Sequence, residues 1–300
     1  VKYNIGLFSQ ITNDIVDGNG TILVPGFSIN TDNNIEFFKY GAYAQLAKVF
    51  FNKRLLISGG VRSDMNTFTE TGDNPLKTLS PRLSLQYKIT PKFDVTASLG
   101  QYYKIPTYTA LGYKDNNGVL VNKNMDYIQS THYVIGTEYL PNDALRFVIE
   151  GFYKQYENYP VSLATGISLA NLGNDFGAIG NEPLVSNGLG KALGMEFSVQ
   201  QKLIKKLFYV ISYTYVESYF AGLDGVYRPS TWDNRHLLST TLGYIFKNNY
   251  QAGIKYRYAG GNPYTPFNMP VSQQSYYLLG TGTLDYAQTN SLRLLDFSQL

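Results

Sequence analysis

The 300-residue sequence contains no cysteine, only two histidines and a single tryptophan. The lack of cysteine excludes a disulfide framework, a thiolate-held iron–sulfur cluster and a cysteine-ligated zinc site. Charged residues make up only 16% of the chain, against roughly a quarter in ordinary soluble domains. The formal net charge of +3 is too small for the basic surface of a nucleic-acid-binding protein, so we expect no nucleic-acid partner.

Long hydrophobic runs are also missing, and tyrosine is abundant instead. No segment approaches the roughly 18 consecutive apolar residues that a membrane-spanning helix requires. The chain has 27 tyrosines, and aromatic residues make up 15% of it. A chain rich in tyrosine and poor in charge has much surface that water does not need to solvate. A membrane barrel is compatible with this composition, because its strands hide their apolar half by alternation.

Apolar and polar residues alternate along most of the chain. Between Arg82 and Ile89 every odd position is apolar and every even position is polar or charged. A period of two predicts β-strands and leaves no helical face. About twelve such segments predict strands, near residues 1–9, 37–48, 54–66, 80–89, 93–104, 130–139, 145–158, 190–200, 207–220, 235–246, 250–259 and 291–300.

Short and long connections alternate between these predicted strands. In an up-and-down barrel, alternate connections lie at the same end, and outer-membrane barrels have short periplasmic turns and long extracellular loops. A soluble β-sandwich or propeller, the alternative, shows no such strict alternation. We therefore predict an all-β, transmembrane, antiparallel up-and-down β-barrel. The short connections are 49–53, 90–92, 140–144, 201–206 and 247–249, and the long ones are 10–36, 67–79, 105–129, 159–189, 221–234 and 260–290.

The alternation separates two surfaces of different chemistry. One parity carries large apolar side chains such as Leu85 and Ile135, and the other carries charged ones such as Arg82 and Glu138. A Lys or Arg that faces lipid at mid-depth costs roughly 2–4 kcal/mol. We therefore expect the charged face to line a wet lumen and the apolar face to contact outer-membrane lipid.

Four stretches resemble barrel motifs of the TonB-dependent receptors of Gram-negative outer membranes. The fourth is a pair, in which Trp232-Asp233-Asn234-Arg235-His236 is followed after one hairpin by Gly260-Gly261-Asn262-Pro263-Tyr264-Thr265-Pro266. The resemblance runs in order along essentially the whole chain and marks barrel architecture more than substrate. The other three stretches are Gly60-Val61-Arg62-Ser63-Asp64, Ser80-Pro81-Arg82-Leu83-Ser84-Leu85 and Gly100-Gln101-Tyr102-Tyr103-Lys104-Ile105-Pro106.

The resemblance implies a barrel of about 22 strands occluded by a plug, in a receptor that imports a scarce nutrient. The nutrient would be an iron chelate, a corrinoid or an oligosaccharide, with energy delivered by periplasmic TonB and its inner-membrane complex. Residues 1–300 would then be a partial barrel domain, roughly strands nine to twenty, without the plug and the terminal strands. A passive porin, or a surface adhesin whose loops bind partners, remains an alternative.

Catalytic and metal-binding patterns are weak in this sequence. By strand parity His132 belongs to the charged face and His236 to the apolar face, so the two cannot easily share a catalytic site. The segments 32–34 and 115–118 offer oxygen ligands but lack the full spacing of a calcium loop, so turn formation is the better interpretation. We expect no cofactor, no metal site and no enzymatic activity.

A captured ligand must first bind at the outer mouth of an occluded barrel, between the loops and the upper lumen wall. The best candidates are charged, aromatic or imidazole side chains of inward parity near the outer strand ends. Their mixed charge favours multidentate hydrogen bonding with aromatic contact. The predicted ligand-binding residues are Arg62, Asp64, Tyr102, His132 and Arg257, beneath the loops 105–129, 159–189 and 260–290.

Overall fold

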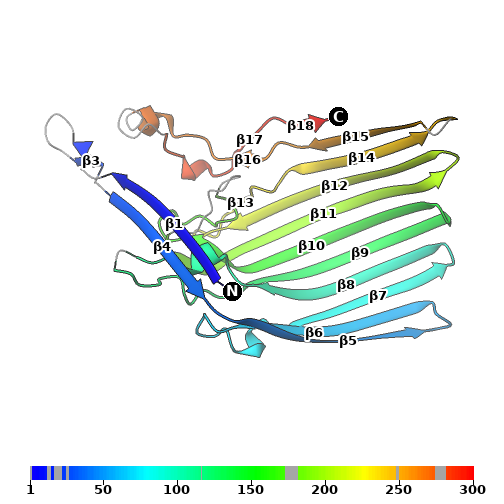
Figure 1. Cartoon of the computed structure of the whole chain (residues 1–300), viewed down its shortest axis with the longest axis horizontal. Helices are drawn as coiled ribbons and strands as arrows, with labels where there is room; N and C mark the ends of the chain where they lie inside the picture. The colour runs from blue at the N-terminus through cyan, green and yellow to red at the C-terminus, as the bar shows by residue number, and fades with distance from the viewer. Residues whose placement is uncertain are drawn as a thin grey trace.

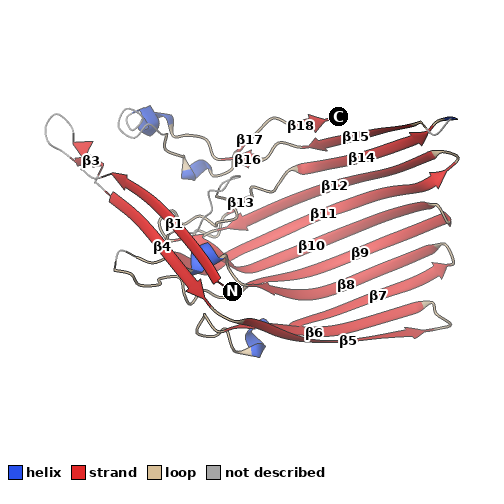
Figure 2. Ribbon diagram, in the orientation of Figure 1, coloured by secondary structure: helices blue, strands red, loops and turns tan. Residues whose placement is uncertain are grey.

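A large antiparallel sheet dominates the computed structural model (Figures 1 and 2). Its 12 strands include every long strand from β5 to β15, ordered as they follow one another along the chain, with β5 at one edge and β18 at the other. The sheet is therefore open in this chain. The structure describes residues 2–11, 15–16, 22–24, 27–115, 117–172, 182–247, 250–273 and 282–300.

The long strands match the alternating segments of the sequence, so the predicted antiparallel up-and-down architecture is confirmed. Each pairs with the next long strand, and the short β13 (Tyr227–Pro229) pairs with β12 beside this path. The long strands are β5 (Lys39–Phe50), β6 (Leu55–Asn66), β7 (Ser80–Thr90), β8 (Phe93–Lys104), β9 (Ile128–Asn142), β10 (Leu145–Ser162), β11 (Leu184–Ile204), β12 (Leu207–Ala221), β14 (Arg235–Ile245) and β15 (Gln251–Ala259).

The two ends of the sheet differ as the connection lengths predict. Figure 1 shows tight turns at one end, which we call the turn end, and long connections at the other, the loop end. Asn52 and Lys53 in the β5–β6 turn, and Lys205 and Lys206 in the β11–β12 turn, have positive φ angles of 48° to 76°. Such left-handed conformations give the tight chain reversal that matches strand twist.

The N-terminal segment departs from the prediction. Residues 1–9 are predicted as a strand of the main sheet, but β1 (Lys2–Ile11) pairs with β4 (Phe27–Glu36) in a separate two-stranded sheet. Residues 10–36, predicted as one long connection between strands, therefore contain strands of their own. Residues 30–34 are all polar, so alternation of apolar residues does not reveal β4. A further pair, β2 (Ile15–Val16) and β3 (Ile22–Val24), lies between them in the sequence.

The C-terminal segment also differs from the single strand predicted over 291–300. β17 (Leu292–Arg293) pairs with β16 (Pro263–Tyr264), and only β18 (Phe297–Gln299) joins the main sheet, against β15. The segment 294–296 between them lies outside any strand. The chain therefore crosses from the loop end to the sheet edge in two short pieces.

Helices are few and short. Those whose bounds lie within the described residues include α1 (Tyr108–Leu111) and the 3-10 turns η1 (Pro75–Thr78) and η3 (Tyr286–Gln288), and residues 269–273 are helical too. Within the described part of the chain, no helix is long and apolar enough to cross a membrane.

The strand register confirms that apolar and polar side chains lie on opposite faces of the sheet. Directly paired residues share a face, so each row across the strands can be followed. We call the two surfaces the apolar face and the polar face. One row of the apolar face is Leu83, Leu99, Tyr133, Tyr153 and Leu193, and the adjacent row of the polar face is Arg82, Gly100, His132, Lys154 and Ala192.

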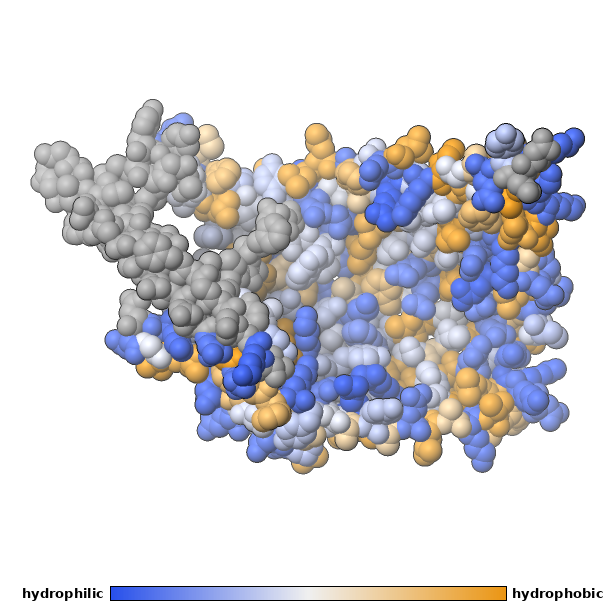
Figure 3. All heavy atoms as spheres, in the orientation of Figure 1, coloured by the Kyte–Doolittle hydropathy of each residue, from blue (hydrophilic) through white to orange (hydrophobic). Residues whose placement is uncertain are grey.

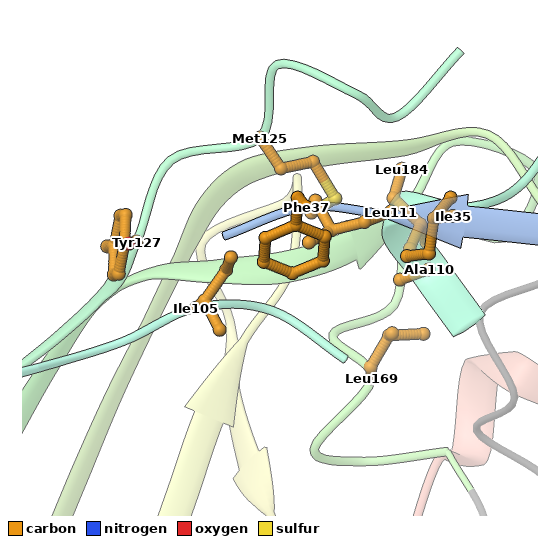
Figure 4. Close-up of a cluster of buried hydrophobic side chains, with 9 residues drawn as sticks. All are labelled: Ile35, Phe37, Ile105, Ala110, Leu111, Met125, Tyr127, Leu169 and Leu184. Carbon is orange, nitrogen blue, oxygen red and sulfur yellow. The ribbon is translucent and has the colours of Figure 1, made fainter. Parts of the chain in front are cut away.

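A compact hydrophobic cluster holds the loop end together. Figure 4 shows Phe37, which follows β4, among side chains that come from other connections and strands. Next to this cluster, buried Asn122 donates to the carbonyl oxygens of Ala110 (3.0 Å) and Glu182 (2.7 Å) and accepts from the Leu184 amide (2.9 Å). The cluster comprises Ile35, Phe37, Ile105, Ala110, Leu111, Met125, Tyr127, Leu169 and Leu184.

Candidate functional site

The five predicted ligand-binding residues all lie on the polar face, but they do not form one group. Arg62 and Asp64 are on β6, Tyr102 is on β8, His132 is on β9 and Arg257 is on β15. Register pairs place Arg62 opposite Ser80, Tyr102 opposite Ser130 and Arg257 opposite Ser239. Arg62 and Tyr102 line one hollow and Tyr102 and His132 line another, whereas Arg257 is several strands away.

Arg62 and Asp64 satisfy each other. The guanidinium donates from Nε to Oδ2 and from Nη2 to Oδ1 of the carboxylate, both at 2.7 Å. This bidentate geometry is the strong form of an Arg–carboxylate pair. The carboxylate of Asp64 is therefore paired with Arg62. It offers a ligand less negative charge than an unpaired aspartate would.

Tyr102 and His132 form an aromatic contact, with ring centroids 4.5 Å apart and an interplanar angle of 36°. The guanidinium carbon of Arg82 lies 4.3 Å from the centroid of the Tyr102 ring, within cation–π range. His132 is hydrogen-bonded through Nε2 to the Ser130 hydroxyl at 2.8 Å. Gly100 makes room for this arrangement, because a Cβ there would lie 2.9 Å from the Tyr102 ring.

Two hollows flank Tyr102 on the polar face. The smaller, of about 400 Å³, is lined by Arg62, Arg82 and Tyr102 together with three serines and with apolar residues such as Leu83 and Leu99. The larger, of about 490 Å³, is the aromatic cavity. Its lining combines cationic and aromatic side chains, and none of the described residues that line it is acidic. The aromatic cavity is lined by Tyr102, Tyr103, Lys104, Ile128, Ser130, His132, Phe152, Lys154, Tyr156, Tyr159, Ala192, Val216, Ser218, Phe220 and Trp232.

Three rings form the wall of this cavity toward the loops. The centroid of buried Phe220 lies 4.6 Å from that of Tyr159, in an edge-on arrangement, and 5.2 Å from that of Tyr156. Gly190 faces Phe220 across the strand pair, and a Cβ at this position would approach the ring to 2.3 Å. The glycine therefore allows the Phe220 ring to lie flat against the sheet.

Sequence reasoning did not select several residues of this cavity. Lys154 lies opposite His132 in the register, and its Nζ is 4.8 Å from the Phe152 ring centroid. Phe220 is near the end of β12, and Trp232 lies in the connection between β12 and β14. The parity of each strand could have shown their common face, but only the register shows which of them are neighbours.

Arg257 belongs to a separate hollow of about 260 Å³, whose lining includes Ser212, Ser239 and Phe297. The two histidines are on opposite faces, as predicted. His236 pairs with Tyr215 and accepts or donates through Nδ1 at 2.8 Å from the Tyr213 hydroxyl. They therefore do not form a common site.

The two candidate calcium segments behave differently. Asp115 accepts hydrogen bonds from the backbone amides of Asn117 and Val119, at 2.9 and 2.8 Å, which confirms the turn predicted there. The turn predicted at residues 32–34 is wrong, because that segment lies within β4. Among the described residues, no group of three or more His, Asp or Glu side chains is arranged to hold a metal.

A buried carboxylate lies in the loop end near the aromatic cavity. Asp233 is fully buried and accepts a hydrogen bond from Arg293 at 2.7 Å, while its Oδ1 has no hydrogen-bond partner in the described part of the chain. Burial raises the pKa of the Asp233 carboxyl, and the hydrogen bond from Arg293 opposes that rise. Sequence reasoning noted Asp233 only as part of a motif.

The two halves of that motif meet in space. The Asn234 side chain donates to the Gly260 carbonyl at 2.9 Å and also contacts the Asn262 side chain. A Cβ at Gly260 would lie 2.2 Å from the Asn234 carbonyl oxygen, so only glycine permits this approach. The two stretches, which are separated by one hairpin in the sequence, are therefore in direct contact.

Comparison with known protein families identifies the family of this chain. The family model described as TonB dependent receptor-like, beta-barrel matches residues 2–297. The chain belongs to the TonB-dependent receptor family. This family consists of receptors and transporters rather than enzymes. No curated protein matches this receptor barrel in sequence.

Solved structures with the same fold include iron and copper transporters. The ferripyoverdine receptor of the outer membrane of Pseudomonas aeruginosa bound to ferripyoverdine is 19% identical, with a TM-score of 0.57 over 94% of this chain and 33% of that chain. The ferric enterobactin receptor of the same organism is 16% identical, with a TM-score of 0.58 over 95% and 38%.

A third similar structure is the copper transporter OprC, with 16% identity and a TM-score of 0.53 over 79% of this chain and 38% of that one. At these identities the likeness establishes the fold. The chain spans about a third of the length of the receptors to which it is similar.

Proposed function

We propose that this chain is part of the barrel of an outer-membrane receptor that imports a scarce nutrient into a Gram-negative cell. The plug, the remaining strands and the contact with TonB and its inner-membrane energising complex would belong to other parts of the receptor. In this proposal residues 1–300 form one partial barrel domain with no catalytic role. Its direct partners are outer-membrane lipid and the small-molecule or oligosaccharide ligand.

The exposed apolar face supports a membrane location. Large side chains of this face are open to their surroundings, including Leu46 (83% exposed), Ile135 (62%) and Met195 (57%). Contiguous apolar surface on this scale is unfavourable in water and is what lipid covers in transmembrane barrels. Most charged side chains of the strands lie on the other face, where water in the lumen would solvate them. Two exceptions on the apolar face, Lys191 and Glu217, are on the loop-end halves of β11 and β12.

The observation that carries the proposal is the aromatic cavity at the loop end of the polar face. Binding sites for small molecules are concave, largely apolar, and contain a few convergent polar groups. Here rings from β8, β10 and β12 surround a cavity of about 490 Å³ that Lys104, His132 and Lys154 also line. The long loops lie at the same end of the sheet (Figure 1).

The free charges of this site favour an anionic ligand with a flat or aromatic part. Asp64 is engaged by Arg62, which leaves Arg82, Lys104 and Lys154 as the charged groups around the two hollows. Aromatic rings would stack on the flat part, and the cations would pair with carboxylate, phenolate or phosphate oxygens. Among the nutrients considered, a negatively charged iron chelate fits best, and ferripyoverdine in a receptor of the same fold supports this class.

Binding of candidate chelates to the purified full-length receptor tests this proposal. We expect Lys154→Gln and Tyr102→Ala each to weaken binding, by about tenfold for loss of one close charge or ring contact. Tyr133→Ala is the matched control, because Tyr133 is a strand tyrosine on the apolar face. Equal effects of Tyr102→Ala and Tyr133→Ala would contradict the site.

Uptake by whole cells separates the importer from the porin. An importer with an occluded lumen needs energy from the periplasm, so uptake of the chelate should stop when the energising complex is deleted. Growth on the chelate that persists without that complex would indicate passive diffusion through a porin instead.

A further inference from the structure

Positive charge is concentrated at the turn end of the sheet. Residues 48–54, 88–94, 138–146, 202–206 and 246–250 contain ten Lys and Arg but only three Asp and Glu. The rest of the chain contains fifteen and nineteen, respectively. The turn end thus carries a formal charge of +7 and the remainder −4, an asymmetry that the net charge of +3 conceals.

The few acidic groups at this end are mostly engaged. Glu138 accepts two hydrogen bonds from Arg146, both at 3.0 Å, and Asp94 accepts one from Gln86 at 2.8 Å. Apart from Arg146, none of the ten cationic side chains is in an ion pair within the described residues. We call seven of these exposed side chains the basic rim, which comprises Lys53, Arg54, Lys92, Lys202, Lys205, Lys206 and Lys247.

Backbone contacts hold parts of the rim in place. Lys92 in the β7–β8 turn donates from Nζ to the Pro141 carbonyl at 2.7 Å, and Lys202 donates to the Asp143 carbonyl at 3.1 Å. The first bond reaches the turn end of β9 and the second reaches the β9–β10 connection, so neighbouring turns are tied together. The charges therefore form a connected edge along the sheet.

Exposed aromatic and aliphatic side chains are interleaved with these cations. Phe51 is 71% exposed, Tyr250 72% and Leu203 52%, and the Lys48 ammonium lies 5.3 Å from the Phe50 ring centroid. Figure 3 shows hydrophilic and hydrophobic residues side by side at the turn end. Basic residues beside exposed aromatic ones are the pattern of a membrane–water interface.

We propose that the basic rim binds the headgroups of anionic phospholipids in the membrane leaflet at the turn end. Lysine and arginine would pair with the phosphates, while Phe51, Leu203 and Tyr250 contact the acyl chains and glycerol region. An acidic protein would match the charges but would leave these apolar side chains in water, so the combination favours lipid. The inference rests on the membrane barrel proposed above.

Lipid binding to the purified full-length receptor in a non-ionic detergent tests this inference. The probes are fluorescent phosphatidylglycerol, which is anionic, and fluorescent phosphatidylcholine, which is zwitterionic. At about 0.1 M salt we expect phosphatidylglycerol to bind at least about tenfold more tightly, and about 0.5 M salt should reduce this preference.

Two sets of substitutions make the test specific. The rim variant combines Lys53→Gln, Arg54→Gln, Lys205→Gln and Lys206→Gln and should lose the preference. The control removes the same charge from the loop end through Lys39→Gln, Lys77→Gln, Lys114→Gln and Lys123→Gln and should keep it. Heat-modifiable migration on gels checks that each variant remains folded.

Equal affinity of the unmodified receptor for both lipids would overturn the inference, and so would a preference retained by the rim variant or lost by the control. Chelate uptake measured on the same variants keeps the two proposals apart. A receptor that prefers phosphatidylglycerol but imports nothing would refute the proposed import alone.

Discussion

The buried carboxylate of Asp233 makes Arg293 a sensitive single position at the loop end. Removal of the Arg293 guanidinium would leave a fully buried carboxylate that already has one unsatisfied oxygen. We expect Arg293→Ala to lower the local opening free energy of residues 230–234 by roughly 3 kcal/mol, the low end for buried pairs, since the Arg293 side chain is 32% exposed. Native-state hydrogen exchange measures this quantity.

Arg228 is the matched control for that substitution. It pairs with Asp224 at 2.7 Å in a neighbouring turn, and the Asp224 side chain is 44% exposed. Exposed pairs contribute little, so Arg228→Ala should change local opening by about 1 kcal/mol or less. Similar changes in exchange for both variants would show that burial of Asp233 is not what matters.

Adjacent residues on β7 test the two faces of the sheet. Leu85 pairs with Ile57 and Ala97 on the apolar face, so Leu85→Arg should destabilise the inserted full-length receptor by roughly 2–4 kcal/mol. Gln86 already donates to Asp94 at 2.8 Å on the polar face. Gln86→Arg should therefore fold like the unmodified receptor in a heat-modifiability assay, and equal assembly of both variants would reject the face assignment.

At the scale of whole elements, Asn122 links the connection after β8 to the β10–β11 hairpin. Its side chain bonds three backbone groups in a buried setting, and each group left unsatisfied costs about 1–3 kcal/mol. We expect Asn122→Ala to accelerate hydrogen exchange in residues 105–127 and 182–189 together. Exposed Asn124, which contacts Glu70, is the control, and Asn124→Ala should leave exchange in 182–189 unchanged.

Elements were predictable from the sequence where alternation is regular and not where the strand geometry breaks it. β7 keeps a strict period of two, β8 keeps it from Phe93 to Gly100, and both strands match their predicted bounds closely. β10 was expected to end near residue 158 but continues to Ser162, because the register shifts at Tyr159 and Asn158 has a φ of +56°. A bulge of this kind moves later side chains to the other parity.

The candidate site was predictable in part for the same reason. Parity alone placed Tyr102 and His132 on one face, and the structure brings their rings together. Lys154 and Phe220 were missed because their neighbours depend on cross-strand register and on glycines at facing positions. The sequence also predicted Arg257 in the same site. Alternation shows which face a residue is on, but not how many strands separate two residues of that face.

At the scale of the molecule, the two ends of the sheet differ in connection length, packing and charge. Loops, buried cluster and aromatic cavity lie at one end, and short basic turns lie at the other. The family to which the chain belongs implies that the loop end faces outward and the turn end faces the periplasm. This orientation is a prediction that thiol labelling of intact cells tests.

Two single-cysteine variants of the full-length receptor serve this purpose, since residues 1–300 contain no cysteine of their own. Lys123 is exposed and is the position chosen at the loop end. Asn171 lies at the same end but is buried, so a cysteine there would label poorly in either orientation. Tyr250, at the turn end, is 72% exposed. With a membrane-impermeant maleimide, Lys123→Cys should label on intact cells, and Tyr250→Cys should label only after the outer membrane is permeabilised. Labelling of Tyr250→Cys alone on intact cells would reverse the orientation and would place the basic rim in the outer leaflet.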